Sequence, residues 1–219
     1  NQTFNYGTLN MTGGPATGSL VEIIATGTQS LSGGSMNLRG GGLAPAVPVG
    51  NSSATIQGGS QSINAGAITL LAGAGTAAGA TSDAILRNLT GNHSITGSGL
   101  MQLTGGAQFS TAGILNQGTG TQTVSGNGGI VLNSGAGAGT NSTSVLIQNT
   151  PATKQTLTAS FGGFGLFNAG AGVVSVLSAG DQQLTSRFVE VATTAGSTGN
   201  ALLSATGTQW IPERWVWAA

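Results

Sequence analysis

Charge is scarce in this chain. Five of its 219 residues are Lys or Arg and five are Asp or Glu, so 5% are charged, against about 25% in an ordinary globular domain. The net charge is zero and no basic patch occurs, which removes the electrostatic footprint of nucleic-acid binding. Cysteine is absent, which excludes a disulfide scaffold and a thiolate metal site. No run of 18 apolar residues occurs, so we expect no membrane span.

The residues that are present are those of strands and turns. Hydrophobic residues make up 38% of the chain, the mean hydropathy is +0.19, and there are 40 glycines. Disordered chains are usually charged and poor in apolar residues, so this composition disfavours disorder. The apolar residues are mostly Ile, Leu, Val and Ala, and the polar ones mostly Ser, Thr, Asn, Gln and Gly, which favours β-structure with many turns.

One motif recurs along the whole chain: a Gln followed two positions later by an apolar residue, as in Gln61 and Ile63. His93 fills the one slot that lacks Gln, and the slots are 27 to 33 residues apart. The eight positions are Gln2, Gln29, Gln61, His93, Gln122, Gln155, Gln182 and Gln209. A repeat of this length predicts an architecture built by stacking one structural unit.

Two further apolar motifs complete each repeat. The first is a pair seven to nine residues after the Gln, such as Ile68 and Leu70. The second lies five to eight residues before the next Gln, and its members include Ile23, Ile56, Ile85, Ile114, Ile147, Val176 and Leu203. Side chains i and i+2 share one face of a strand, so each repeat predicts three short strands joined by turns.

These patterns predict an all-β fold, a parallel β-solenoid that forms a single domain over residues 1–219. About seven three-strand coils of 27–33 residues should start near residues 2, 29, 61, 93, 122, 155 and 182, with a partial coil or cap at 209–219. Gly/Ala-rich stretches such as Ala72–Ala80 should hold the extra residues of the longer coils. Right-handed coiling is expected, because parallel strand connections favour that hand.

The recurring Gln shares a face with the apolar residue two positions on, so its side chain should point inward near a corner of the coil. Stacked side-chain amides can donate to one neighbour and accept from the other, which satisfies a polar group that is costly to bury unpaired. We therefore predict an internal amide ladder rather than a ligand site. His93 can also donate and accept, so we interpret it as a ladder member rather than a ligand or general base.

The outward residues beside the Gln positions form an uncharged column rich in hydroxyl groups. Its middle part comprises Ser30, Ser62, Ser94, Thr123 and Thr156. Ser and Thr suit any solvated strand, so this column is either plain solvated surface or a packing and binding face. The partner of such a face would be a neighbouring solenoid, a glycan or ice.

The C-terminal coils differ from the rest of the chain. Lys154 and Asp181 each precede a ladder Gln in adjacent coils, which predicts a stacked ion pair. Trp210, Trp215 and Trp217 are all the tryptophans of the chain, and they predict either a cap over the open core or a contact with another subunit. Because Gln2 already belongs to a repeat, we expect either a fragment of a longer solenoid or a subunit that stacks end to end.

The residues needed for catalysis or metal binding are not arranged in pairs. The five acids, Glu22, Asp83, Asp181, Glu190 and Glu213, fall in different columns of the repeat. Two cooperating carboxylates would be needed to hydrolyse a glycan, and a single His does not support a Ser-His-Asp arrangement. We therefore expect no catalytic residue, metal or cofactor. A polysaccharide lyase or hydrolase acting through Asp181, Glu190 and Glu213 is the weakest alternative.

The phrase Gly59-Ser-Gln-Ser-Ile-Asn-Ala-Gly66, followed by Ala67-Ile-Thr-Leu70, resembles the repeats of filamentous-haemagglutinin-like bacterial exoproteins. The resemblance extends from Gln2 to about Ile211. It implies a right-handed parallel β-helix, secretion to the cell surface, and a role in adhesion, aggregation or biofilm. We therefore expect a non-enzymatic, extracellular structural protein that stacks with itself as a head-to-tail homopolymer or with flanking chain. A glycan- or ice-binding solenoid is the alternative.

Overall fold

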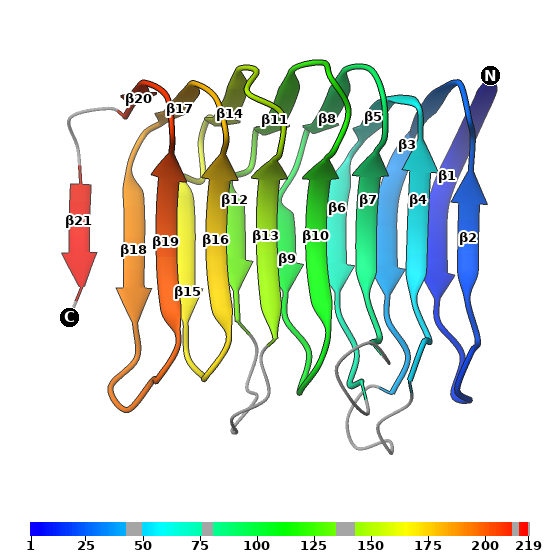
Figure 1. Cartoon of the computed structure of the whole chain (residues 1–219), viewed down its shortest axis with the longest axis horizontal. Helices are drawn as coiled ribbons and strands as arrows, with labels where there is room; N and C mark the ends of the chain where they lie inside the picture. The colour runs from blue at the N-terminus through cyan, green and yellow to red at the C-terminus, as the bar shows by residue number, and fades with distance from the viewer. Residues whose placement is uncertain (43–49, 76–80, 135–142, 212–214, 219) are drawn as a thin grey trace.

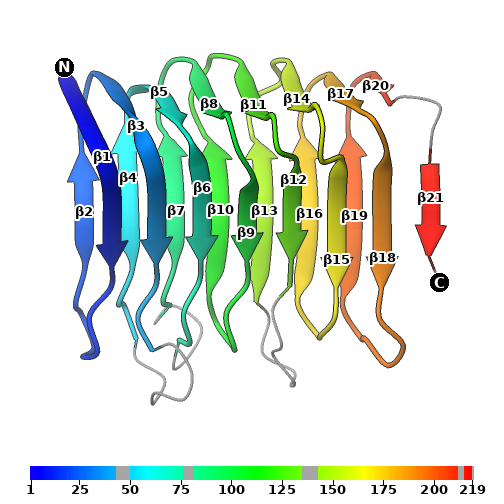
Figure 2. The ribbon, with the colours of Figure 1, turned by 180° about the vertical axis from the view of Figure 1, so that it is seen from behind.

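A computed structural model describes residues 1–42, 50–75, 81–134, 143–211 and the backbone of 215–218. These residues form a parallel β-solenoid whose coils stack along one axis, with the two ends of the chain at opposite ends of the stack (Figure 1). The third to seventh coils contribute three strands each, whereas each of the first two contributes one long strand and one short strand. The same stack, seen from behind, shows the second strands of the coils side by side (Figure 2). The predicted fold class is therefore confirmed, and the handedness stays a prediction.

The strands fall into three stacks. Strands β1 (Gln2–Thr12) and β3 (Thr28–Arg39) are long and run through both the first and the second stack. The first stack continues with β5 (Ser60–Ala65), β8 (His93–Gly97), β11 (Gln122–Gly126), β14 (Gln155–Ala159), β17 (Gln182–Ser186) and β20 (Gln209–Trp210). The second continues with β6 (Ala67–Leu71), β9 (Met101–Thr104), β12 (Ile130–Asn133), β15 (Phe164–Asn168), β18 (Val189–Thr193) and β21 (Trp215–Ala218). The third comprises β2 (Val21–Ile24), β4 (Ala54–Gly58), β7 (Ala84–Asn88), β10 (Thr111–Asn116), β13 (Ser144–Asn149), β16 (Val173–Ser178) and β19 (Asn200–Ala205).

The register of the parallel strands follows the sequence repeat. Gln2 is aligned with Gln29, Gln29 with Gln61, and Gln61 with His93. The alignment continues through Gln122, Gln155, Gln182 and Gln209. The eight Gln and His positions therefore form one column along the stack.

The core lies inside the three stacks. The pairs predicted for the second strand are aligned from coil to coil, as in Met36, Ile68 and Met101, and all three side chains are fully buried. Small residues such as Ala54 and Ala84 fill the inner positions at the start of the third strands. Period-2 alternation thus lines the interior with apolar side chains, and burial of their surface stabilises the fold.

One predicted core position is wrong. The repeat pattern assigns Ile85 to the third apolar column, but Leu86 is the residue aligned with Ile56 and Ile114. Ile85 is instead aligned with Thr55 and Gly113, on the other face of the strand. Both residues are apolar and buried. The variable spacing to the next ladder residue admits either choice, so the sequence pattern alone does not decide between them.

The extra residues of the longer coils are predicted to lie in stretches such as Ala72–Ala80 and Gly135–Gly139. The stretch 135–139 lies outside the described residues, as do 76–80. In the part of the chain that is described, no helix is long and apolar enough to cross a membrane.

Candidate functional site

The column of Gln side chains forms a continuous hydrogen-bonded ladder. Nε2 of Gln29 donates to Oε1 of Gln2 at 3.0 Å, and Nε2 of Gln61 donates to Oε1 of Gln29 at 2.7 Å. After His93 the pattern resumes, with donor–acceptor distances of 2.6, 2.6 and 2.5 Å for the bonds donated by Gln155, Gln182 and Gln209. Several amides use their second N–H on a carbonyl of the third stack, as Gln122 does with Ile114 at 3.3 Å. The predicted internal ladder is confirmed.

All bonds of this ladder run in one direction. Each Nε2 group donates to the residue of the preceding coil, and each Oε1 group accepts from the following coil. Gln2 accepts from Gln29 but donates to nothing in the described chain, and Gln209 donates to Gln182 but accepts nothing there. Within the described residues, Nε2 of Gln2 and Oε1 of Gln209 are thus the two ladder atoms that no other ladder member bonds.

His93 belongs to this ladder in one tautomer. Its Nε2 lies 2.8 Å from Oε1 of Gln61, an acceptor, so Nε2 carries the proton. Its Nδ1 lies 3.4 Å from Nε2 of Gln122, a donor, so Nδ1 is unprotonated. The ring is fully buried, and burial lowers the pKa of His93 from its ordinary 6.5 to about 3. A neutral, enclosed imidazole with both nitrogens occupied is a structural group, as predicted from the sequence.

A second, shorter amide ladder was missed by the sequence reasoning. Nδ2 of Asn88 donates to Oδ1 of Asn116 at 2.8 Å, and Nδ2 of Asn116 donates to Oδ1 of Asn149 at 2.7 Å. These residues end the third strands β7, β10 and β13 and are buried. The signal was an Asn five or six residues before the next ladder position in three consecutive coils. It lies in a chain so rich in Asn, Ser and Thr that it did not stand out.

The hydroxyl column is aligned as the repeat predicts. Ser30, Ser62, Ser94, Thr123 and Thr156 follow one another across β3, β5, β8, β11 and β14. Each of these side chains is half-buried or exposed on the outer surface. The column continues with Gln183 and ends at Trp210, which is 53% exposed. The geometry thus provides a straight uncharged face, and its role as a binding face stays a prediction.

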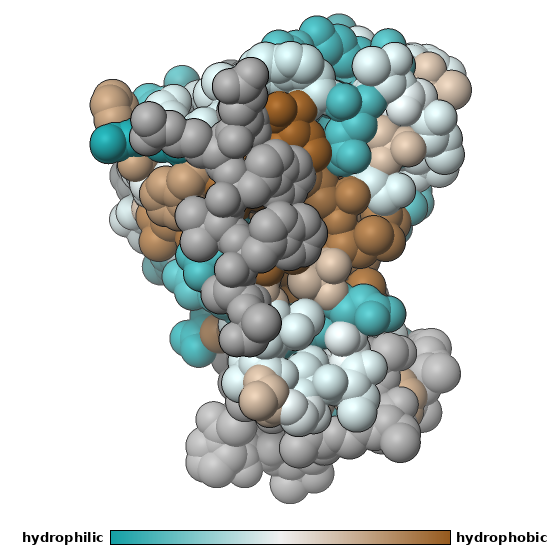
Figure 3. Space-filling view, turned by 90° about the vertical axis from the view of Figure 1, so that its left-hand side faces the viewer, coloured by the Kyte–Doolittle hydropathy of each residue, from teal (hydrophilic) through white to brown (hydrophobic). Residues whose placement is uncertain are grey.

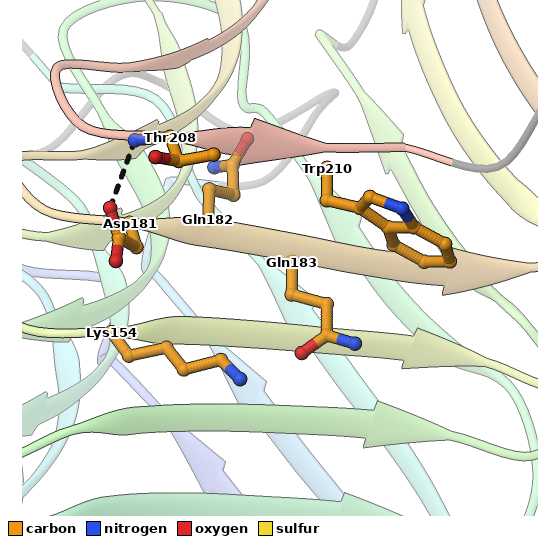
Figure 4. A pocket seen from close by; sticks show the side chains of 6 residues that line it. All are labelled: Lys154, Asp181, Gln182, Gln183, Thr208 and Trp210. Carbon is orange, nitrogen blue, oxygen red and sulfur yellow. Dashed lines mark hydrogen bonds between the residues drawn. The ribbon is translucent and has the colours of Figure 1, made fainter.

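The predicted ion pair between Lys154 and Asp181 does not form between these two described side chains. Their backbones do lie in adjacent coils, since the Gln155 N–H donates to the Asp181 carbonyl at 2.8 Å. The Asp181 carboxylate, however, accepts a hydrogen bond from the Thr208 N–H at 2.9 Å, and the Lys154 side chain points away from it (Figure 4). A backbone donor that is already fixed in place satisfies the carboxylate at a lower cost in side-chain entropy than an exposed lysine does.

A shallow hollow of about 320 Å³ opens beside these residues on the outer surface. It is lined by Lys154, Asp181, Gln182, Gln183, Thr208 and Trp210 (Figure 4). Trp210 occupies the outward column, aligned with Gln183, so it does not cover the core as a cap would. Trp215 and Trp217 lie in β21, but their side chains are outside the described part of the structure, so their predicted capping or contact role stays open.

The two end coils expose apolar side chains that the other coils bury. Phe4 of the first coil is 39% exposed, whereas Leu31, aligned with it in the next coil, is 1% exposed. Val21 of β2, aligned with the fully buried Ala54, is 37% exposed at the same end. At the other end, Leu203 and Ile211 are only partly buried, and hydrophobic residues gather in the middle of that end face (Figure 3).

The acids of the described chain do not converge. Glu190 is aligned with Gly165 in β15, away from the column of Asp181, and Glu213 lies outside the described residues. Asp83 accepts hydrogen bonds from the Thr81 hydroxyl at 2.7 Å and the Thr111 N–H at 2.7 Å. Burial raises the pKa of Asp83, against the lowering effect of these bonds and of the nearby Arg87. Within the described ranges, no three His, Asp or Glu residues lie close enough to hold a metal ion.

The outer face of the third stack is a further feature that the sequence reasoning missed. Ile85 and Leu115 point outward there, yet both are buried. The signal was a run of adjacent apolar residues in place of alternation, as in Ala84-Ile85-Leu86, which is typical of a strand covered on both faces.

No protein-family model matches the chain, and no match was found among curated proteins or among solved structures. The likeness to filamentous-haemagglutinin-like repeats therefore remains one of repeat pattern, and what is established is the β-solenoid fold.

Proposed function

We propose that this chain is a structural module of an extracellular bacterial fibre, adhesin or biofilm matrix, in which solenoids associate end to end. The observation that carries the proposal is the pair of open end faces. Phe4 occupies a core position and is 39% exposed, and at the other end of the described stack Gln209 and Trp210 are exposed. Burying such surface is the main favourable term in protein association.

The strand edges at both ends also lack the usual protection against pairing. Natural edge strands carry charges, prolines or bulges that prevent another chain from adding to them. The terminal strands β1, β2, β19, β20 and β21 contain one charged residue among them, Glu22 in β2. With a net charge of zero, there is no long-range repulsion to keep two copies apart. The resemblance to secreted exoproteins supports the extracellular location.

The test is negative-stain electron microscopy over a range of concentrations, combined with the mass in solution by analytical ultracentrifugation. We expect rods that lengthen with concentration and contain only the 21.2 kDa chain. Single short rods and a constant monomer mass at high concentration would overturn the proposal.

A glycan- or ice-binding surface is the second candidate, favoured by the outer column that ends at Trp210. An exposed indole beside Lys154, Asp181 and Gln183 offers a flat apolar platform with polar groups at its rim (Figure 4), the combination that small-molecule sites use. Affinity electrophoresis in gels containing soluble polysaccharides tests glycan binding with Trp210→Ala and Ser62→Tyr, and thermal hysteresis tests ice binding. If both variants behave as the unmodified chain does, this outer column is not a binding surface.

A further inference from the structure

A hollow of about 270 Å³ opens on the outer surface of the third stack. It lies where three neighbouring strands, β13, β16 and β19, end side by side (Figure 1). The hollow therefore crosses three successive coils. The outward side chains that line it are Gln148, Thr150, Leu177, Ala179, Ser204 and Thr206.

The alignment of the coils gives this hollow an apolar floor between two polar walls. Leu177 is aligned with Gln148 in the preceding coil and with Ser204 in the following coil. All three side chains are half-buried. The side-chain amide of Gln148 and the hydroxyl group of Ser204 can each donate and accept hydrogen bonds, one on either side of the Leu177 side chain.

The same order is repeated two residues further along the chain, where Ala179 lies between Thr150 and Thr206. The Ala179 N–H donates to the Asn149 carbonyl at 2.9 Å and the Thr206 N–H donates to the Ser178 carbonyl at 3.0 Å, so the parallel pairing continues past the strand ends. The Thr206 hydroxyl donates to the Ala179 carbonyl at 2.5 Å, which leaves its oxygen able to accept a hydrogen bond. Because the alanine side chain is short, the floor is open between the two threonines.

The chemistry of the lining side chains selects a class of ligand. None of them is ionisable, so the hollow offers no ion pair to a charged molecule. A pyranose ring with equatorial hydroxyl groups has C–H groups on its faces and hydroxyl groups around its rim, which matches an apolar floor with polar walls. Neighbouring coils are about 4.8 Å apart, so the two walls lie about 10 Å apart, which admits one such ring.

We propose that this hollow binds one unit of an uncharged glycan, with a face of the sugar on Leu177 and Ala179 and its hydroxyl groups bonded to Gln148 and Ser204. The inference goes beyond the proposed function, because it assigns a ligand site to the side of the solenoid. It is also separate from the first-stack column that ends at Trp210. Pockets that enclose a whole small molecule measure about 300–1,000 Å³, so this shallower site should bind with a dissociation constant near about 1 mM.

Saturation-transfer NMR with cellohexaose, a neutral β-glucan, tests the proposal. The method detects the bound sugar whether the protein is a single chain or a rod, so the result does not depend on self-association. We expect a saturable signal from the unmodified chain. The same hexamer with each C6 oxidised to a carboxylate should bind no more tightly, because no lining side chain can pair with its charges.

Two variants change the hollow on the outer surface of the coil. Ala179→Ile fills the floor and should raise the dissociation constant at least about tenfold. Gln148→Ala removes one hydrogen-bonding group and should raise it about fivefold. The matched controls are Gln117→Ile and Gln57→Ala, which make substitutions of the same kind in the same two columns of other coils and should bind as the unmodified chain does.

Three results would overturn the inference. The first is no saturable cellohexaose signal, and the second is tighter binding of the carboxylated hexamer. The third is equal binding by the hollow variants and their controls, and loss of binding in Trp210→Ala would then place the sugar on the first-stack column instead. Each of these results leaves end-to-end association to its own test by microscopy and sedimentation.

Discussion

Nε2 of His93 lies 2.8 Å from Oε1 of Gln61, inside the core and in the middle of the amide ladder. Its other nitrogen faces the amide nitrogen of Gln122 at 3.4 Å. A protonated ring would bring two donors face to face at Nδ1, in a buried site. We therefore expect this one imidazole to make a largely uncharged protein sensitive to acid.

Acidification should destabilise the fold through His93. Its pKa is about 3 in the folded state and near 6.5 in the unfolded chain, so between these values the unfolded state binds more protons. Stability is then fully present above pH 6.5 and falls by up to about 1.4 kcal/mol for each pH unit below it. At pH 5 the loss should be about 2 kcal/mol, measured as a lower midpoint of urea unfolding than at pH 7.

His93→Gln should remove most of this acid sensitivity, because Gln fills the same slot in seven other coils and does not titrate. Asp83 acts in the opposite sense, since burial raises its pKa and the folded state then binds the extra proton. The comparison of His93→Gln with the unmodified chain cancels that contribution. An unchanged difference in stability between pH 7 and pH 5 in the variant would show that His93 is not the sensor.

Breaking the ladder at a buried position should cost far more than the same change one residue away. Gln182→Leu removes the donor to Gln155 and the acceptor for Gln209. Oε1 of the buried Gln155 is then left unpaired at about 1–3 kcal/mol, whereas Nε2 of the exposed Gln209 can bond water. Gln183→Leu makes the identical change on the outer face, where the side chain is half-buried, and should alter stability by less than about 0.5 kcal/mol. Equal free energies of unfolding for the two variants would contradict a stabilising ladder.

The Gln ladder could be predicted from the sequence because equivalent positions in successive coils of a solenoid have the same surroundings. A Gln that recurs at the same position of each coil therefore marks one structural position. The same logic placed Met36, Ile68 and Met101 in one core column. It did not separate Ile85 from Leu86, since both faces of β7 accept an apolar residue and the turn before His93 varies in length. The repeat shows which residues of neighbouring coils are aligned. Whether Ile85 or Leu86 points into the core depends on side-chain packing, which the repeat does not specify.

The error at Lys154 and Asp181 has a different cause. The repeat correctly placed the two residues in adjacent coils, but it specified neither side-chain rotamer nor competing donors. The Thr208 N–H, held by its own coil, donates to the Asp181 carboxylate instead. Opposite charges at the surface gain little from pairing. The repeat therefore predicted correctly that Lys154 and Asp181 lie in adjacent coils, but not which group the Asp181 carboxylate contacts.

A negative charge placed in the Asn ladder should destabilise the fold. Oδ1 of Asn116 accepts from Asn88, and Nδ2 donates to Asn149 and to the Gly120 carbonyl at 2.9 Å. Asn116→Asp keeps the size but loses both donated bonds and buries a carboxylate, which should cost at least about 3 kcal/mol at pH 7.

Gln117→Glu adds the same charge at the next, exposed residue and is the matched control. We expect thermal unfolding of Asn116→Asp to shift markedly and that of Gln117→Glu to stay near the unmodified value. Recovery of Asn116→Asp as the pH is lowered, through protonation of the new carboxyl, would support the electrostatic explanation over a steric one.

The last prediction concerns the glycines at the corner between the second and third strands. A methyl group on Gly73 would overlap the carbonyl oxygen of Gly41 in the preceding coil, and that oxygen accepts a hydrogen bond from the Ala74 N–H at 3.1 Å. Gly106 approaches the Gly73 carbonyl in the same way one coil further on. The obstacle is backbone rather than a flexible side chain, so relief requires the coils to separate at this corner.

Gly73→Ala should therefore destabilise the fold by at least about 2 kcal/mol. Gly7→Ala is the control, because a methyl group there meets nothing within 4 Å, and it should be close to neutral. Chemical unfolding followed by circular dichroism compares the two, and a neutral Gly73→Ala would mean that the coils are not packed as closely at this corner as the structure has them.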